Sequence, residues 1–368
     1  MFPFSKPKPL PPLELAVPKT WDELTTEQLE EVSRIFVESA KAYTATGQYS
    51  EADVLSRCFL ALAGLRVLSP VLYDDADDMD DEDPSKAFFE CEFVDEAVRK
   101  RKQSHDGQIV PVRIYLNELL YLSVGTPDID KKGSFKGMKG GLQWLLNSCD
   151  RTIFPYPEYT FPGTGKGRKK TPDVTFQGPA ILMQNFSWRQ YRIASDYMGF
   201  IPKVENALLT MRKNSVKFGS TRIKAQEEQL QQVRAEFLAT LFNASIPHIN
   251  EETGQQETSY YYVSSQCADN AHFFLDFPEE KFQAILFWWQ GMMHYLSKQY
   301  PKVFKKEKVG RSGPEDDPFK LYTRSTTTMI KYAATNEEQV NKTTYTIILQ
   351  HINDMAEENE RIDKMKKK

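Results

Sequence analysis

The feature that most constrains this chain is one long apolar stretch, residues 274–304, which reads FLDFPEEKFQAILFWWQGMMHYLSKQYPKVF. Apolar side chains recur in it at steps of three and four residues, the spacing of one face of an α-helix. Pro278 and the two glutamates after it suit a first helical turn, and Lys298 followed by Pro301 suits a last one. We therefore predict a buried helix at residues 279–300, covered by other helices. Its apolar stripe comprises Phe282, Ile285, Leu286, Trp289, Met292, Met293, Leu296 and Tyr300.

Composition and charge are those of an ordinary soluble globular chain. Of the 368 residues, 40% are hydrophobic and 27% are charged. The net charge of -4 gives no overall field that favours nucleic acid or an anionic membrane surface. No stretch reaches the roughly 18 apolar residues of a membrane span. We therefore predict a soluble protein that meets no membrane and no specific nucleic acid. Four widely spaced cysteines fit reduced core thiols better than a disulfide framework or a zinc site, which predicts a cytoplasmic setting: Cys58, Cys91, Cys149 and Cys267.

The N-terminal residues 1–19 form a proline-rich arm. Proline at this density prevents a helix or a central strand, so we expect the arm to run extended. Nothing in it requires burial in the home core, and its few apolar side chains are suited to lie along a neighbouring protein. These candidate partner-binding residues are Leu10, Leu13, Leu15 and Val17.

Residues 20–153 are predicted to form an N-terminal helical lobe. It opens with a helical hairpin at residues 20–68, in which Thr25 and Gln28 have capping-box spacing. Gly47 ends the first helix and Ser50 begins the second. Beyond it we expect a short helical segment from Phe88 to Lys102 and a strand entering a helix at residues 109–124.

Residues 74–83, DDADDMDDED, place eight carboxylates in ten positions within this lobe. Their mutual repulsion disfavours compact structure, so we interpret them as an acidic loop. A calcium-binding EF-hand loop is the alternative. It requires glycine at its sixth position and glutamate at its twelfth, and no register here supplies both.

Residues 154–180 are predicted to form a long, irregular, basic Gly/Pro loop between two lobes. The GTGKG within it resembles a phosphate-binding loop, but Thr160 stands where that motif needs glycine and Gly167 where it needs a hydroxyl. A mobile basic loop that touches an acidic partner surface is a better interpretation than nucleotide binding, and a loop that is simply solvated and flexible is better still. Its candidate binding residues are Lys166, Arg168, Lys169 and Lys170.

Residues 181–355 are predicted to form a larger C-terminal helical lobe. A helix capped by Ser187 is expected to break at Gly199 and Pro202, and Gly219 is expected to break the chain again. A short hairpin is expected at residues 249–263. The charged tail, residues 356–368, is expected to fray.

No pattern typical of catalysis or metal binding occurs in the sequence. The five histidines are never paired at helical ligand spacing, and no nucleophile elbow is present. His294, on the central helix, is interpreted as a core or rim histidine. We therefore predict no catalytic residue, no metal, no cofactor and no enzymatic activity.

The order of these features resembles that of uncharacterised proteins encoded in tail modules of phages and prophages from gut bacteria. Such proteins look like tail assembly chaperones or other non-enzymatic tail components, whose helical surfaces bind another tail protein. The long loops at 74–83 and 154–180 depart from a minimal helical chaperone. The residues that carry the resemblance are Pro18, Trp21, Asp22, Glu23 and Leu24, then Trp289, Gly291, Tyr300, Pro301, Val303 and Phe304.

Together these observations predict a mainly α protein: a helical hairpin plus a larger multi-helix lobe, with minor β structure and long irregular loops. The expected function is chaperone-like protein binding in phage or prophage tail assembly, in the cytoplasm of the bacterial host, with another tail protein as partner. The alternatives are a virion structural tail subunit and a nucleotide-binding protein that uses the loop around Lys166.

Overall fold

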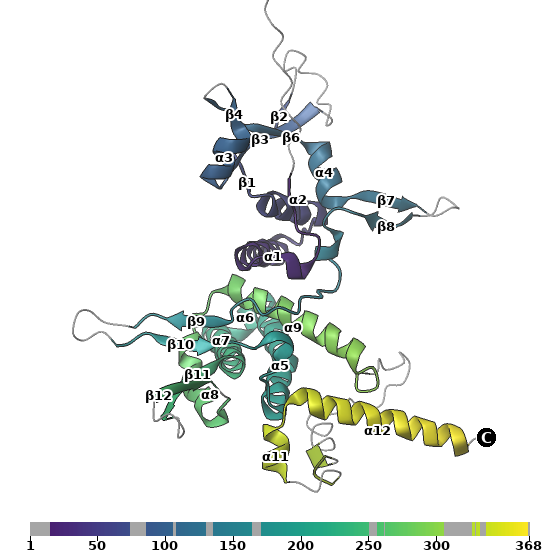
Figure 1. Cartoon of the computed structure of the whole chain (residues 1–368). Coiled ribbons are helices and arrows are strands. Elements are labelled where there is room, and N and C mark those ends of the chain that lie inside the picture. The colour runs from purple at the N-terminus through teal and green to yellow at the C-terminus, as the bar shows by residue number, and fades with distance from the viewer. Residues whose placement is uncertain are drawn as a thin grey trace, which may run out of the picture. The chain divides into compact units, whose positions relative to one another are not determined.

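The fold is mainly α-helical, as predicted, with small antiparallel sheets (Figure 1). The chain divides into two compact units, Met1–Cys149 and Asp150–Lys368. The division therefore lies a few residues ahead of the expected connection at 154–180. The computed structural model describes residues 15–73, 86–105, 108–129, 135–163, 171–249, 256–260, 262–304, 326–327, 329–331 and 336–366.

The first unit opens with the predicted helical hairpin, α1 (Thr26–Thr46) and α2 (Glu51–Leu62). Thr25 and Gln28 form the expected capping box, with each side chain accepting from the other's backbone N–H. Gly47 ends α1 with φ at 73°, a left-handed conformation that glycine adopts without steric cost. The Ser50 hydroxyl accepts from Asp53 N at 3.2 Å. Local capping chemistry thus sets three of the four ends of the hairpin.

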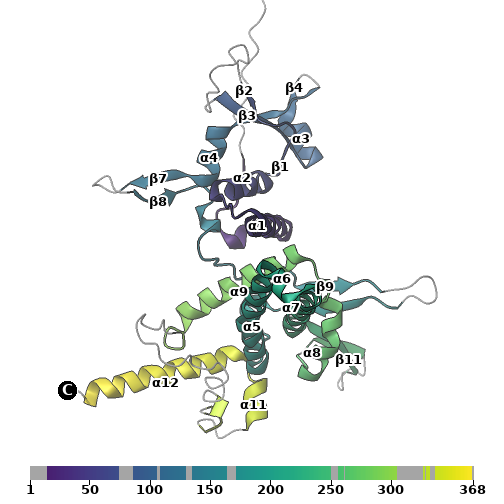
Figure 2. The same ribbon diagram turned by 180° about the vertical axis from the view of Figure 1, so that it is seen from behind.

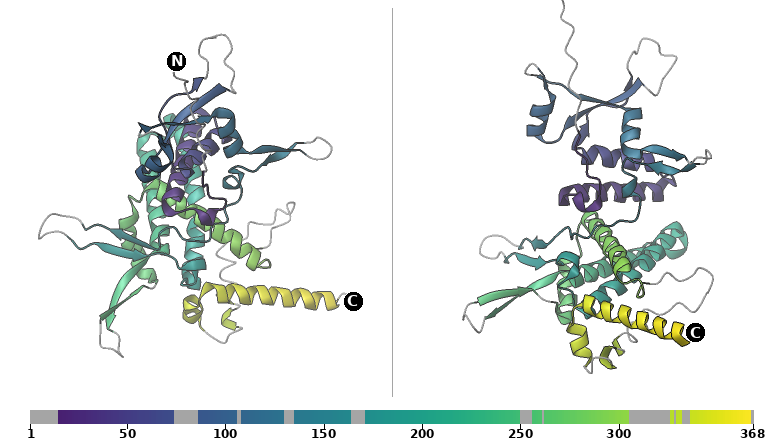
Figure 3. Two further views of the ribbon diagram at one scale, coloured as in Figure 1. Left: turned by 45° about the horizontal axis from the view of Figure 1, so that its top comes forward. Right: turned by 45° about the vertical axis from the view of Figure 1, so that its right-hand side comes forward.

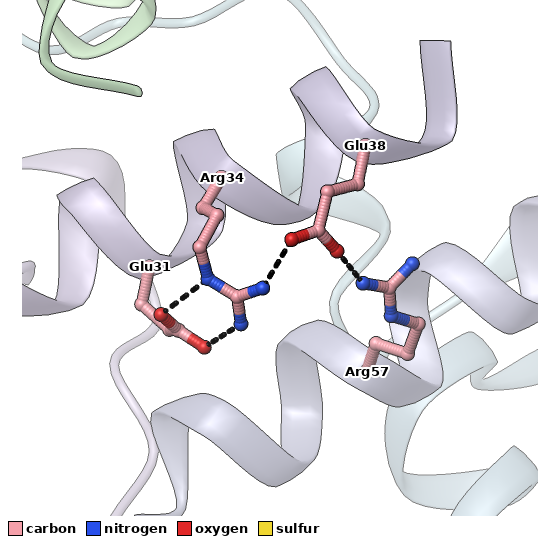
Figure 4. Close-up of polar contacts among 4 residues, drawn as sticks. All are labelled: Glu31, Arg34, Glu38 and Arg57. Carbon is pink, nitrogen blue, oxygen red and sulfur yellow. Dashed lines mark hydrogen bonds and ion pairs between the residues drawn. The ribbon is translucent and has the colours of Figure 1, made fainter. Parts of the chain in front are cut away.

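A chain of ion pairs joins the two helices of this hairpin (Figure 4). Arg34 contacts Glu31 and Glu38 on its own helix, and Glu38 also contacts Arg57 of α2. All four side chains are between one-third and one-half exposed. Because exposed pairs are screened by water, the network contributes little stability and acts mainly on how the two helices are aligned.

The sheet of the first unit is built on β3 (Ala87–Phe93). β1 (Leu65–Val67) and β2 (Leu72–Tyr73) pair with one side of it, and β6 (Val112–Tyr115) pairs with the other. The buried Gln103 amide bonds the backbone of this strand, accepting from Phe93 N at 3.0 Å and donating to Cys91 O at 3.2 Å.

The predicted helix from Phe88 to Lys102 is therefore wrong in its first half. The alternation in AFFECEF forms a strand, because one face of that strand packs on the unit's helices. The helix begins only at α3 (Glu96–Gln103), which Asp95 caps. The expected strand entering a helix is confirmed by β6 and α4 (Leu116–Val124). The remaining elements of the unit are η1 (Trp21–Glu23), β4 (Ser104–His105), β5 (Gln108–Ile109), β7 (Thr126–Ile129), β8 (Phe135–Lys139) and η3 (Gln143–Leu145).

The second unit is built around α9 (Glu279–Gln299), the predicted central helix. Trp288 is fully buried, and its ring lies 4.6 Å from that of Phe154, centroid to centroid. Trp289 packs edge-on against Phe237 at 5.7 Å. The prediction of a buried helix at this position is confirmed, including its coverage on several sides.

A four-stranded antiparallel sheet in the order β12-β11-β10-β9 packs beside these helices. Its two hairpins project from the helices (Figure 3). A hairpin was expected at residues 249–263; the β11–β12 hairpin begins earlier, at Asn243, and only its second strand lies within that range. The strands are β9 (Glu158–Phe161), β10 (Val174–Gln177), β11 (Asn243–Ile249) and β12 (Gln256–Tyr260).

The prediction that residues 154–180 form an irregular loop is wrong at 158–161 and at 174–177, which form the paired strands β9 and β10. Aromatic side chains explain the difference. Phe161 and Phe176 lie 5.0 and 5.2 Å from the ring of Phe274. Burial of large aromatic groups stabilises a pairing that the prolines and glycines around it do not predict.

The long helix α5 (Trp188–Lys213) runs unbroken through Gly199 and Pro202, against the prediction of a break there. It packs along α7 (Ser220–Leu241), and the two helices lie side by side from front and back (Figure 1, Figure 2). Ile201 and Val204 are buried on either side of the proline. Packing of this face against α7 therefore outweighs the lost backbone hydrogen bond.

The predicted fraying of residues 356–368 is also not observed, since α12 (Tyr345–Lys366) continues through most of them. Lys302 Nζ lies 2.5 Å from Glu360 Oε2, and Arg361 Nε lies 2.9 Å from Glu358 Oε2. The Arg361–Glu358 pair has helical spacing, and Lys302 contacts α12 from outside it; both pairs support the exposed part of the helix. The remaining elements of the second unit are η5 (Ile181–Met183), α6 (Ser215–Phe218), α8 (Ser264–Asn270), η6 (Ala271–Phe274) and α11 (Glu337–Lys342).

Candidate functional site

Most of the predicted binding residues lie outside the described residues, so the site that they were predicted to form stays a prediction. Leu10 and Leu13 lie outside the described residues, as does the acidic run 74–83, and Leu15 and Val17 are partly exposed. Residues 164–170, which contain Lys166, Arg168, Lys169 and Lys170, also lie outside them. The chain on either side of that segment is closed by a hydrogen bond of 2.8 Å from Gly163 N to Asp173 Oδ1. These seven residues therefore connect β9 to β10.

A different candidate lies at the far end of the α5–α7 hairpin, residues 209–229, which we call the hairpin end. The last buried residue of α5 is Leu208, and the first of α7 is Leu230. Between them no residue is buried. The hairpin end therefore adds little to the core of the second unit, and core packing places little constraint on its sequence.

The hairpin end is strongly basic. It carries five cationic side chains, and no carboxylate occurs between Glu205 and Glu227. Two of the five are paired: Arg212 with Glu227 at 2.6 Å, and Lys224 with Glu228 at 3.9 Å. The other three form no ion pair with any described residue and are exposed; they are Lys213, Lys217 and Arg222. We call these three the cationic cluster. It is a local positive field on a chain whose net charge is -4.

An apolar side chain stands within the cationic cluster. Val216, on the single turn α6, is fully exposed. The next aromatic, Phe218, is half-buried, and the Lys217 ammonium lies 5.8 Å from the centre of its ring. Gly219 then adopts φ 72°, which lets the chain reverse into α7. The turn thus presents one apolar group surrounded by positive charge.

Polar contacts along the hairpin hold its two helices in register. The Tyr197 hydroxyl donates to Glu236 Oε2 at 3.0 Å, and burial together with this carboxylate raises the pKa of Tyr197. Further out, Arg234 Nη2 donates to Glu205 Oε1 at 2.7 Å. The Arg212 pair with Glu227 lies further out still. These contacts preorganise the hairpin end, so binding there costs little ordering of the backbone.

The second unit also contains an open groove of about 860 Å³. It lies between the start of α5, the short α11 and the residues before α8, and its lining includes Arg189, Tyr262 and Lys342. Lys342 is paired with Glu338 at 2.7 Å. Burial raises the pKa of Tyr262, and the neighbouring Cys267 raises it further.

The thiol that neighbours Tyr262 is that of Cys267. Burial raises the pKa of the Cys267 thiol, and hydrogen bonds from Tyr262 and Thr240 only partly offset that effect. A thiol with a raised pKa stays protonated at neutral pH and is a poor nucleophile. Its sulfur lies 3.5 Å from Ala239 O, as expected of a protonated structural thiol.

Among the described residues, no three side chains that could ligate a metal ion lie together. No described helix is both long and apolar enough to cross a membrane.

Comparison with protein-family models, with curated proteins and with solved structures finds no match to this chain. Assignment of function therefore rests on the residues themselves.

Sequence reasoning missed the hairpin end because it treated Gly219 as a simple break. A signal was present in the sequence. Between Glu205 and Glu227 the chain carries five cations and no carboxylate, on segments that are otherwise good helix formers. That pattern indicates a charged surface on a helix end, but only the burial pattern shows that the end projects beyond the core.

Proposed function

We propose that this chain is a non-enzymatic, protein-binding component of phage or prophage tail assembly, with a chaperone-like role. The observation that supports protein binding is the hairpin end, a rigid, unburied surface that combines a cationic cluster with a fully exposed apolar side chain. The resemblance of the Pro18 to Leu24 and Trp289 to Phe304 motifs to tail-module proteins supplies the setting.

The hairpin end presents three exposed cations that form no ion pair with a described residue, and an apolar side chain that is fully exposed. A partner that carries carboxylates and an apolar group pairs with the cations and covers the valine. The proposed partner is accordingly another tail protein, bound in the cytoplasm of the bacterial host before the tail is complete.

Affinity capture tests this function. The full-length chain, tagged at its C-terminus, is expressed in a bacterium that carries the complete tail module, and captured proteins are identified by mass spectrometry. The proposal predicts that a tail protein is captured in stoichiometric amounts. Capture of no tail protein, with the tagged chain folded and abundant, would contradict it.

The same preparation separates a chaperone from a virion structural subunit. Mass spectrometry of purified particles should find the captured tail protein and not this chain. If the chain is present in the particles at a fixed ratio, it is a structural subunit.

Calorimetric titration with ATP and Mg²⁺ tests the alternative function, nucleotide binding through Lys166. Saturable binding that disappears in Lys166→Ala would favour that alternative.

A further inference from the structure

We propose that the hairpin end binds an acidic segment of its partner protein, whose carboxylates pair with Lys213, Lys217 and Arg222 and whose apolar side chain covers Val216. This inference rests on the proposed function, because it specifies the chemistry of the surface that the partner presents.

Three cations of the hairpin end form no ion pair with any described residue. They lie at the end of α5, on α6 and at the start of α7, so they belong to one turn of ten residues, 213–222. Each is exposed and long enough to follow a partner's carboxylate. The surface therefore attracts a short stretch with several negative charges more strongly than a single carboxylate.

The exposed Val216 favours a protein over a nucleic acid as the partner. A phosphate backbone offers no apolar group to cover Val216, whereas an acidic peptide segment can place a leucine or methionine there. Nucleic acid binding also uses a basic track that follows the strand. Here the track stops, because Glu227 and Glu228 lie on the next turn of α7 and already pair with Arg212 and Lys224. The remaining positive surface suits a short acidic segment.

The geometry also favours binding without rearrangement. The cross-links Tyr197–Glu236, Glu205–Arg234 and Arg212–Glu227 fix the two helices behind the turn. The surface is already formed before a partner segment binds. The entropic cost of binding therefore comes mainly from the ordering of that segment. Electrostatic attraction then increases the association rate and makes it sensitive to salt.

The test uses the full-length chain and a defined probe, a fluorescein-labelled ten-residue peptide with six glutamates and two leucines, followed by fluorescence anisotropy. We expect saturable binding that weakens about tenfold or more in the triple variant Lys213→Glu, Lys217→Glu, Arg222→Glu.

The matched control, Lys203→Glu, Lys331→Glu, Lys364→Glu, has the same change in net charge at exposed positions away from the hairpin end. On a logarithmic scale, the loss of peptide affinity in this control should be less than half of the loss in the hairpin-end variant. Val216→Ser should weaken binding of the peptide that contains leucines. It should leave unchanged the binding of a peptide in which alanines replace the leucines.

Three results would overturn the inference. One is no binding at low salt. The second is equal weakening by the two triple variants, which would indicate only net charge. The third is equal or tighter binding of a single-stranded oligonucleotide of the same charge, which would indicate a general polyanion site. Failure of this test with tail-protein capture intact would reject the acidic segment and keep the proposed function. Peptide binding without tail-protein capture would keep the acidic segment and reject the proposed function.

Discussion

Gly291 of the central helix lies directly against the backbone of Arg151: a Cβ on the glycine would lie 2.0 Å from the Arg151 carbonyl oxygen. The segment that enters the second unit thus crosses α9 at its one glycine. Just beyond the crossing, Trp288 Nε1 donates to Thr152 O at 3.2 Å, and Phe154 packs against the same indole. The absence of a side chain at one helical position therefore decides how the segment enters the core.

Gly291→Ala should destabilise the second unit by about 1–3 kcal/mol, since the added methyl group meets backbone that has to move. Urea unfolding followed by tryptophan fluorescence measures the loss. Gly199→Ala is the matched control. That glycine is also inside a helix, but an added Cβ has no atom within 4 Å, so alanine should be neutral or stabilising by up to about 1 kcal/mol. Equal effects of the two substitutions would show that the close approach at Arg151 is not formed.

Trp289→Ala should cost about 3–5 kcal/mol, the range for removal of a large buried aromatic side chain. Trp289 is 4% exposed and packs against Phe237 and Tyr191. Thermal unfolding followed by circular dichroism measures the effect. An unchanged melting temperature would contradict the assignment of α9 as the central buried helix.

The buried cysteines should be unreactive in the folded protein. Burial raises the pKa of Cys58 to about 12 and that of Cys91 to about 11. Ellman's reagent at pH 8 should therefore label them only after unfolding, while the partly exposed Cys267 reacts first. A Cys267→Ser variant should remove the early phase. Rapid labelling of Cys58 in the folded protein would contradict its burial.

The same thiols should make stability depend on alkaline pH. An unfolded thiol has a pKa of about 8.5, so the folded state holds these protons more tightly. The contribution is complete below that value and is lost as pH rises toward the folded pKa of Cys58, about 12. The free energy of unfolding, measured from pH 8 to pH 10.5, should fall less steeply in Cys58→Ala than in the native chain. An identical slope would contradict this linkage.

The ion-pair chain of the α1–α2 hairpin should show the opposite pH dependence. Burial alone would raise the pKa of Glu38, but hydrogen bonds from Arg57 and Arg34 outweigh it and lower that pKa. The stabilisation is present above the unfolded pKa of Glu and is lost as pH falls through the lowered one. Because Glu38 is 43% exposed, Glu38→Gln should cost no more than about 1 kcal/mol at pH 7, and less at pH 3. A cost that grows toward low pH would contradict the assignment.

The sequence predicted those parts of the fold whose causes are local. Thr25 and Gln28 lie three residues apart, and the stripe of the central helix repeats every three to four residues, so the signal lies within one window. The pairing of β9 with β10 depends instead on Phe274, about a hundred residues further along the chain. Pro202 was misleading for the same reason, because its helix is held by packing against α7. Contacts of this kind are formed by the tertiary fold, and a local pattern does not report them.

The candidate site could not be predicted from the sequence for a different reason. The five cations around Gly219 are visible in the sequence, but charge alone does not separate a solvated helix face from a projecting end. The distinction comes from Leu208 and Leu230, which mark where burial stops and resumes. Val216, at this turn, is the most exposed of the large hydrophobic side chains among the described residues.

The central claim, that the hairpin end is the surface by which this chain binds another protein, is tested most directly by quantitative capture of tail protein from the host. The tagged native chain is compared with the Lys213→Glu, Lys217→Glu, Arg222→Glu variant and with the charge-matched Lys203→Glu, Lys331→Glu, Lys364→Glu control, all three with confirmed melting temperatures. The account predicts that the first variant loses at least about nine-tenths of the captured tail protein, while the control retains most of it. Undiminished capture by the folded hairpin-end variant would contradict it.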